Sequence, residues 1–444
     1  MERTVVPSDQ LAGAPIARTG PRKPALLSSV VSVGGVSAVS IAAALFAHAF
    51  RESILAVAHG LGGTGGSVEA ARAIGPGAVF VLVTFGVATA AWIGRVAQRR
   101  YGEQLGLRAI AAAARGEQPG PTVGGSAVRA GATWVATSSL ASLGREAPIM
   151  EIGGSLGNVV GRLVGRPRHR LAVTGIAAAF AVAYHAPVAA VLYVEEHLGM
   201  RHDRRTVTHA VAGSVIGFLF AQQLLGSRPI FPSAIAPLSS DTIVMALVGV
   251  LPAYAASRLF LEARDRLAGH SPSVRRASMR ALLLAMVVGI VVALVPLTAG
   301  NGMEALRTSA TMSTAGVAVA LLIGKLIATT AAVGSGAPGG VVSPSLAVAG
   351  GAALVSFVAL DALGVQLGGS KWDGILIAMG VGVAISVRSP LVALVIVAEM
   401  AGDARVLPLA ALAVGVAVAL DRAVDHVQRS TGKPVPTALH DEDG

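Results

Sequence analysis

The stretch SLGREAPIMEIGGSLG, residues 142–157, places one arginine and two glutamates among residues that are otherwise small or apolar. Pro148 favours the first turn of a helix, because proline lacks the N–H group that has no partner there. The amides of residues 144–147 would then point out of the helix start, where the partial positive charge of the helix dipole also lies. This stretch therefore predicts a broken helix whose start can bind an anion.

The composition of the whole chain is typical of a membrane protein. Of its 444 residues, 53% are hydrophobic and only 13% are charged, and the mean hydropathy is +0.69. This balance lies outside the range of soluble domains. Several apolar runs match the roughly 20 residues that a membrane-spanning helix needs, whereas others are shorter. The runs are residues 25–50, 75–93, 171–194, 207–225, 242–260, 281–297, 317–333, 375–385 and 406–424.

The net charge of +11 comes from basic residues in connecting segments, such as 166–170 and 201–205. This distribution indicates contact with lipid headgroups and does not indicate nucleic-acid binding. Because Arg18, Arg22 and Lys23 precede the first apolar run, we expect a cytoplasmic N-terminus in a multi-pass protein of the cell (inner) membrane. No signal peptide is expected, since the first 24 residues lack an apolar core. The absence of cysteine excludes disulfides and cysteine-ligated metals.

Two segments of the chain repeat one another. GIAAAFAVAYHAPVAAVLYVEE (175–196) and GVAISVRSPLVALVIVAEM (382–400) each carry a glutamate nine positions after a proline. The pairs are Pro187 with Glu196 and Pro390 with Glu399. Duplicated halves with interrupted apolar helices are typical of transporters. The alternative is a chance match in a chain so rich in Ala, Gly and Val.

A second broken helix is predicted in GGVVSP, where Pro344 follows the amides of residues 340–343. Non-helical backbone at membrane depth must line a polar cavity or be buried against protein, because hydrocarbon offers its amides no partner. Two helix starts that converge from the two halves would bind an anion without a buried lysine or arginine. The predicted fold class is an all-α integral membrane protein with broken transmembrane helices.

Glu146 is the strongest functional candidate in the chain. A charged side chain at the bilayer centre costs about 2.5 kcal/mol or more on insertion scales, so an intramembrane carboxylate indicates function. As an anion, it could occupy the amide-lined position when ionised and swing away when protonated. The alternative is that it pairs with Arg145. Glu151 falls on another helical face and is predicted to make a local polar contact.

Glu195 and Glu196 follow an apolar run and precede a basic segment. One interpretation is a solvated helix end that nearby arginines neutralise. The other makes Glu196 a relay that carries protons from the cytoplasm toward Glu146. His185 is predicted to be a packed polar residue and not a ligand.

GREAPIMEIGG (144–154), YHAPVAAVLYVEE (184–196) and GSGAPGGVVSP (334–344) together resemble signatures of the CLC family of chloride channels and chloride/proton antiporters. The resemblance runs from about Ala25 to Leu439 and is to bacterial-type members without cytosolic CBS domains. It implies a CLC-type fold of two inverted repeats in a membrane homodimer. The expected division is a cytoplasmic tail (1–24), a transmembrane domain (25–427, with repeats at about 25–225 and 240–427) and a C-terminal tail (428–444).

The resemblance also implies roles for single residues. Glu146 matches the external gating glutamate, and Glu196 matches the internal proton-transfer glutamate. The amides of Val341 and Val342 match positions that coordinate the anion. The full expected anion site contains Gly144, Arg145, Ala147, Gly340, Val341 and Val342.

Two departures from the family pattern concern its side-chain ligands. In QLGLR (104–108), which takes the place of the GSGIP signature, Leu105 stands before Gly106 where a serine belongs. In GKPVPTAL (432–439), Pro436 stands where a tyrosine would contact the anion. The expected site therefore consists of backbone amides only, with Leu105, Gly106 and Pro436 as weak equivalents.

These observations predict a transporter of chloride or a similar small anion that exchanges chloride for protons and needs no cofactor. A passive chloride channel and a fluoride/proton antiporter remain alternatives, since the fluoride-exporting branch of the family also lacks the two ligands. An intramembrane enzyme is not expected. The sequence has no HExxH motif, no serine motif with a base and no paired intramembrane aspartates.

Overall fold

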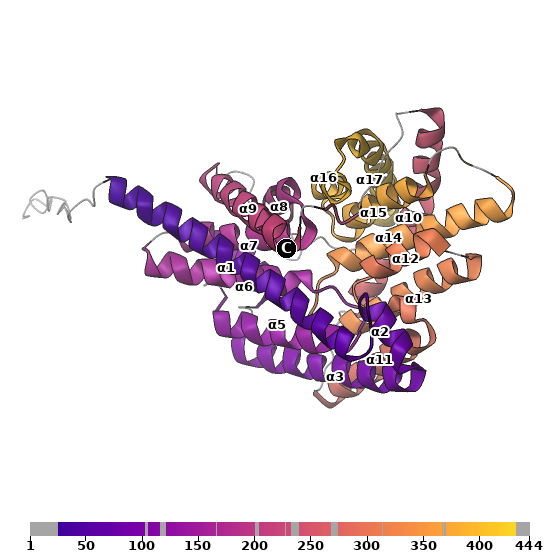
Figure 1. Cartoon of the computed structure of the whole chain (residues 1–444), viewed down its shortest axis with the longest axis horizontal. Helices are drawn as coiled ribbons and strands as arrows, with labels where there is room; N and C mark the ends of the chain where they lie inside the picture. The colour runs from indigo at the N-terminus through magenta and orange to yellow at the C-terminus, as the bar shows by residue number, and fades with distance from the viewer. Residues whose placement is uncertain are drawn as a thin grey trace, which may run out of the picture.

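The computed structural model of the chain is built from helices (Figure 1). It describes residues 25–102, 105–115, 121–165, 167–199, 204–226, 228–231, 239–267, 274–312, 314–365, 367 and 370–431. Within these ranges the chain forms no strand, and one isolated antiparallel bridge joins Gly144 to Gly340. The predicted all-α fold is confirmed.

The helices of the first half are α1 (Ala25–Gly60), α2 (Ser67–Ile74), α3 (Pro76–Tyr101), α4 (Gly106–Arg115), α5 (Val123–Ser138), α6 (Glu146–Leu163), α7 (Arg168–Tyr184), α8 (Pro187–Leu192), the π-helix η1 (Tyr193–His197) and α9 (Arg204–Leu225). Those of the second half are α10 (Ser240–Leu267), α11 (Val274–Leu294), the 3-10 helix η2 (Pro296–Thr298), α12 (Met303–Met312), α13 (Ala315–Gly334), α14 (Val342–Ala362), α15 (Lys371–Ser386), α16 (Pro390–Ala401), the 3-10 helix η3 (Ala404–Val406) and α17 (Leu407–Ser430). Helix α17 continues a few residues past the predicted start of the C-terminal tail at 428.

Eight helices in the described ranges are long and apolar enough to cross a membrane. They are Val33–Gly60, Pro76–Tyr101, Arg204–Leu224, Ser240–Leu267, Arg275–Leu294, Ala315–Gly334, Val342–Ala362 and Ala404–Ser430. Other apolar helices are shorter, among them α16 with 12 residues. The chain is therefore a multi-pass membrane protein that combines helices long enough to span with helices too short to cross.

The apolar run 171–194 is not one helix. Helix α7 ends at Tyr184, His185 adopts the left-handed conformation with φ 51°, and α8 begins at Pro187. Proline at the first helical position lacks an N–H that would be unpaired there, so it starts α8 and prevents continuation from α7. The break divides the apolar run into two separate helices, α7 and α8.

Equivalent positions of the two halves share unusual backbone angles. His185 (φ 51°) and Arg388 (φ 54°) each precede by two residues the proline that begins α8 or α16. Leu140 (φ 67°) and Gly336 (φ 85°) each lie six residues before the start of α6 or α14. A chance likeness in composition does not produce matched left-handed residues, because most residue types rarely adopt this conformation. The repeat is therefore a property of the fold.

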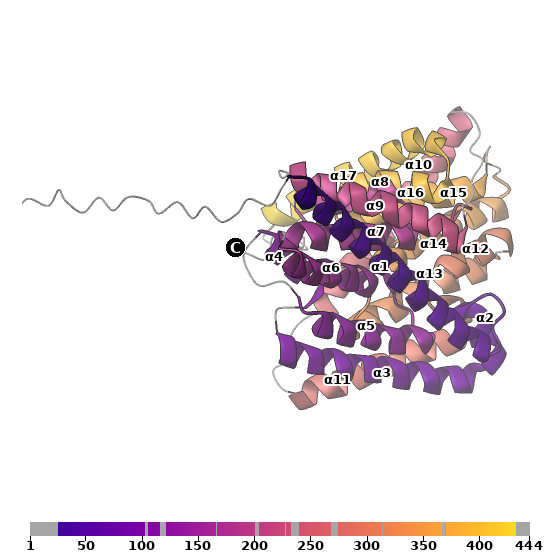
Figure 2. The same ribbon diagram turned by 60° about the vertical axis from the view of Figure 1, so that its left-hand side comes forward.

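Helices α6 and α14, which begin at the two predicted breaks, lie in the middle of the molecule (Figures 1 and 2). Helix α6 packs against α7, and α14 packs against α15. Helices α3 and α11 pack together along one edge, and α8 and α16 pack together toward the opposite edge (Figure 2). This arrangement surrounds the starts of α6 and α14 with protein.

Glycine allows α6 and α7 to approach each other closely. A Cβ added to Gly175 would overlap the carbonyl group of Gly153, and one added to Gly153 would overlap the carbonyl group of Gly175. Small residues at such crossings are the usual way in which membrane helices bring their backbones together. Since α6 begins at Glu146, this contact also fixes the position of the helix start.

Candidate functional site

The starts of α6 and α14 meet at one point in the structure. Gly144 N–H donates to the carbonyl of Gly340 at 3.1 Å, and Gly340 N–H donates to the carbonyl of Gly144 at 2.8 Å. Each glycine lies two residues before its helix, so the two halves approach this bridge in the same way. The predicted convergence of the two broken helices is observed.

Amides without an acceptor inside the helix remain as donors at these starts. The first N–H groups of a helix have no acceptor within the helix. Pro148 and Pro344, each the third residue of its helix, have no N–H group at all. The remaining donors of the first turns are the amides of Glu146, Ala147, Val342 and Ser343.

The bridge corrects part of the predicted anion site. The amides of Gly144 and Gly340 are bonded to each other's carbonyls, so they are not donors to an anion. Arg145 and Val341 are the residues that precede the two helices. Ala147 and Val342 carry amides at the helix starts, as predicted.

The Glu146 side chain lies at the meeting point, and only 3% of its residue surface is exposed. Its Oε1 accepts hydrogen bonds from Ser343 Oγ at 2.6 Å and from Asn301 Nδ2 at 3.2 Å. Its Oε2 is buried and has no hydrogen-bond partner among the described residues. No ion pair joins it to Arg145 in this part of the chain, so the predicted alternative of a simple Arg145 pair is not what the structure shows.

The two bridge glycines make room for this carboxylate. A Cβ on Gly144 would lie 2.6 Å from Glu146 Oε2, and one on Gly340 would lie 3.1 Å from the same atom. Any larger residue would therefore crowd the carboxylate. Gly144 and Gly340 thus leave room for the carboxylate and form the bridge between the halves. The sequence had instead suggested them as donors to an anion.

Sequence reasoning missed the side-chain donors at this site. Ser343 lies within the quoted GGVVSP stretch, yet only its amide was considered. Asn301 lies in the loop between η2 and α12, which no motif singled out. The expected site of backbone amides did not include these two groups, a hydroxyl and a carboxamide, which hold Glu146 in the structure.

The QLGLR segment does not join the Glu146 site. The amide of Gly106, which begins α4, donates to Glu151 Oε1 at 3.0 Å. Arg129 Nε pairs with Glu151 Oε2 at 2.9 Å, and Glu151 is 1% exposed. The start of α4 is therefore occupied by a carboxylate of the protein itself, and Gly106 is not a free anion ligand. Leu105 is buried beside it.

Glu151 thus makes long-range contacts instead of the predicted local one, because its partners lie 22 and 45 residues away. Pro436, the third weak equivalent, lies outside the described residues, as do the predicted N-terminal tail and residues 432–444 of the C-terminal tail.

Glu196 and Glu399 each bind the start of a helix in the other half of the chain. The Glu196 carboxylate accepts from the amides of Leu391 and Val392, at 3.1 and 2.9 Å, in the first turn of α16. The Glu399 carboxylate accepts from the first-turn amides of α8, both at 2.8 Å. Carboxylates at helix starts are stabilised by the unpaired amides and by the helix dipole. Each half therefore caps a helix of the other.

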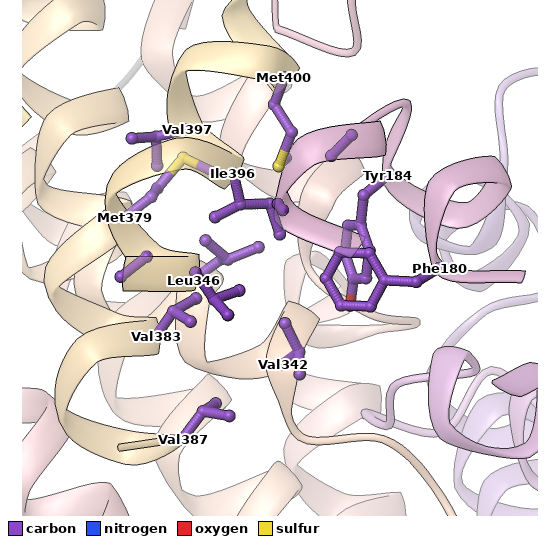
Figure 3. Packing of buried hydrophobic residues seen from close by; sticks show 14 of the residues in the cluster. Phe180, Tyr184, Val342, Leu346, Met379, Val383, Val387, Ile396, Val397 and Met400 are labelled. Carbon is purple, nitrogen blue, oxygen red and sulfur yellow. The ribbon is translucent and has the colours of Figure 1, made fainter. Parts of the chain in front are cut away.

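Aromatic rings connect the Glu146 site with η1. Tyr184 Oη lies 3.3 Å from Ser343 Oγ, and its ring packs on Phe180 with centroids 4.8 Å apart. Phe180 packs on Tyr193, which stacks on His197. Figure 3 shows Phe180 and Tyr184 pointing from α7 toward Val342 and other apolar residues of the second half. The region beside the carboxylate is consequently aromatic and apolar.

Several known proteins resemble this chain in sequence or in fold. A family profile described as "Voltage gated chloride channel" matches residues 85–422. The H(+)/Cl(-) exchange transporter ClcA of Vibrio parahaemolyticus serotype O3:K6 is 26% identical over 280 residues, which cover 59% of each chain. ClcA of Salmonella paratyphi A is 26% identical over 273 residues, which cover 58% of this chain and 57% of the relative. The chain thus spans less than two thirds of the length of these relatives.

Two solved structures are similar over most of the chain. A slow cyanobacterial Cl-/H+ antiporter has a TM-score of 0.73 at 18% identity, covering 93% of this chain and 99% of the other. A CLC-type fluoride/proton antiporter has a TM-score of 0.67 at 15% identity, covering 89% and 96%. At such identities the likeness establishes the fold, with its two inverted repeats, and does not choose the anion.

Proposed function

This chain belongs to the voltage-gated chloride channel family, and we propose that it exchanges chloride for protons across a membrane. The observation that carries the proposal is the buried Glu146 carboxylate at the meeting point of two helix starts. The curated relatives named above are chloride/proton exchangers, which supports the same substrates for this chain.

The proposed mechanism uses competition between two anions. The helix starts of α6 and α14 and their free amides favour negative charge at one place. When Glu146 is ionised, its carboxylate takes that place. When Glu146 binds a proton, it loses its charge, moves out, and lets the transported anion enter. Because Glu146 binds its proton as the anion enters, the two movements are coupled, and they are opposite when the proton arrives from the side toward which the anion moves.

Reconstitution into liposomes tests the exchange. We expect a chloride gradient to drive protons uphill, against their own gradient, and we expect no such movement when chloride is equal on both sides. The rival function, passive chloride conduction, predicts chloride flux without uphill proton movement. The assay is repeated with fluoride, because the chain shares its fold with a fluoride/proton antiporter.

For the inner end of the proton path, Glu196 remains our proposal. A relay at this position would have to release the amides of Leu391 and Val392 that its carboxylate binds. The repeat supplies a matched control, because Glu399 makes the same pair of bonds to α8.

We expect Glu196→Gln to lower proton movement at least tenfold while chloride flux continues, and Glu399→Gln to leave the ratio of proton to chloride flux near that of the unaltered protein. Glutamine keeps an acceptor for the helix start but cannot carry a proton. Both fluxes are measured in liposomes. Equal loss in the two variants would assign the carboxylates to helix capping alone.

We also propose an inner-membrane homodimer with a cytoplasmic N-terminus. The basic residues at 18, 22 and 23 support the orientation, since cytoplasmic segments carry an excess of Lys and Arg. The mass of the detergent-solubilised protein, measured by light scattering, tests the dimer.

A further inference from the structure

Two side chains hold the Glu146 carboxylate, and both are donors. Ser343 Oγ and Asn301 Nδ2 converge on the same oxygen, Oε1. Hydrogen bonds to a carboxylate are shorter than neutral ones, and the 2.6 Å distance to Ser343 falls in that range. The position of Oε1 is therefore an anion position that two neutral side chains define.

The proton of the Ser343 hydroxyl is used in the hydrogen bond to Glu146. A hydroxyl has one proton, so when Ser343 donates to Glu146 it must accept from Tyr184 Oη, which lies 3.3 Å away. Donation by Tyr184 polarises the serine hydroxyl and strengthens its own donation. Ser343 is 1% exposed, so no bulk water competes for the hydroxyl.

Asn301 is oriented by contacts on its other side. Its Oδ1 accepts from the amide of Met303 at 3.3 Å, which turns Nδ2 toward Glu146. The preceding loop is held by Lys325, whose Nζ donates to the carbonyls of Thr298 and Gly300 at 3.2 and 2.6 Å. Lys325 is completely buried in α13, so its contacts are made inside the protein.

We propose that Ser343 and Asn301 form a side-chain receptor for the transported anion, which a chloride-sized monovalent anion occupies whenever Glu146 is protonated and has moved out. The inference rests on the anion transport proposed above and specifies the ligands of that site. Loss of the carboxylate leaves the buried donor of Ser343 and the half-buried donor of Asn301 without this acceptor, which is unfavourable until an anion replaces it. Both donors are neutral, so neither of the two proposed ligands itself carries a charge that would trap the anion.

Chloride binding in detergent tests the receptor. Calorimetric titration with chloride is carried out in the Glu146→Ala background, where no carboxylate occupies the site. We expect Ser343→Ala and Asn301→Leu each to weaken chloride binding about tenfold or more, the effect of losing one hydrogen bond to a charged group. The unaltered protein should bind chloride more weakly than Glu146→Ala, because its carboxylate competes.

Ser345→Ala is the matched control. Ser345 is buried two residues along the same helix, but its Oγ donates back to the carbonyl of Val341 at 2.7 Å. We expect this variant to bind chloride as its Glu146→Ala parent does. Equal affinities for Ser343→Ala and Ser345→Ala would overturn the receptor.

A second measurement covers variants that fail to fold. Crystals of Glu146→Ala soaked in bromide should show an anomalous peak within hydrogen-bond distance of Ser343 Oγ and Asn301 Nδ2. A peak held by backbone amides alone would overturn the proposal. Both measurements are independent of proton coupling, so a protein that binds bromide here but pumps no protons would lose the exchange proposal and keep the receptor.

Discussion

Replacing Glu146 with glutamine is expected to abolish proton movement while chloride flux continues. Glutamine has nearly the shape of glutamate and can still accept from Ser343, but it neither ionises nor carries a proton. The coupled step therefore disappears, and the anion position is no longer contested by a negative charge. In liposomes, the proton flux driven by a chloride gradient should fall to the level of protein-free vesicles.

Glu52→Gln is a suitable control, because it makes the same chemical change on the exposed surface of α1. The Glu52 side chain is 49% accessible. This variant should exchange both ions like the unaltered protein. Proton movement that survives in Glu146→Gln would show that another group carries the proton, and the assigned role of Glu146 would be wrong.

Gly175→Ala is expected to prevent correct packing of the first half. Its Cβ would overlap the backbone of Gly153 in α6, which cannot give way as a flexible side chain can. Overpacking of this kind costs about 3 kcal/mol, and here it would also push the start of α6 away from the Gly340 bridge. We expect a clear fall in the temperature at which the detergent-solubilised protein unfolds, together with loss of transport.

Gly131→Ala provides the comparison, since a Cβ at this exposed position of α5 would meet nothing within 4 Å. Alanine is a better helix former than glycine, so this variant should be at least as stable as the unaltered protein. A Gly175→Ala protein with an unchanged unfolding temperature would mean that α6 and α7 are not packed as closely as the structure shows.

The sequence predicts where helices begin when residues within one helical turn determine the start. Pro148 and Pro344 lie in the first turns of α6 and α14, as the missing N–H of proline requires. The prolines at 187 and 390 begin matching helices for the same reason. These are effects within a few residues, so a single sequence contains the information for them.

The partners of the acidic residues could not be predicted in this way. Asn301 reaches Glu146 across 155 residues, and Arg129 reaches Glu151 from another helix. Such contacts depend on the relative placement of whole helices, which no local pattern encodes. The glutamates at 196 and 399 were visible as equivalent positions, but a repeat in sequence does not reveal that each binds the other half.

The caps that Glu196 and Glu399 form on helices of the opposite half affect the synthesis of the protein. While the ribosome is still producing the second half, the first turn of α8 has been synthesised but Glu399, the acceptor for its amides, has not. The first turn of α8 therefore lacks its capping carboxylate until most of the second half has been made. Since a missing cap costs a helix about 1 kcal/mol, we expect a chain truncated before residue 399 to have a less stable α8.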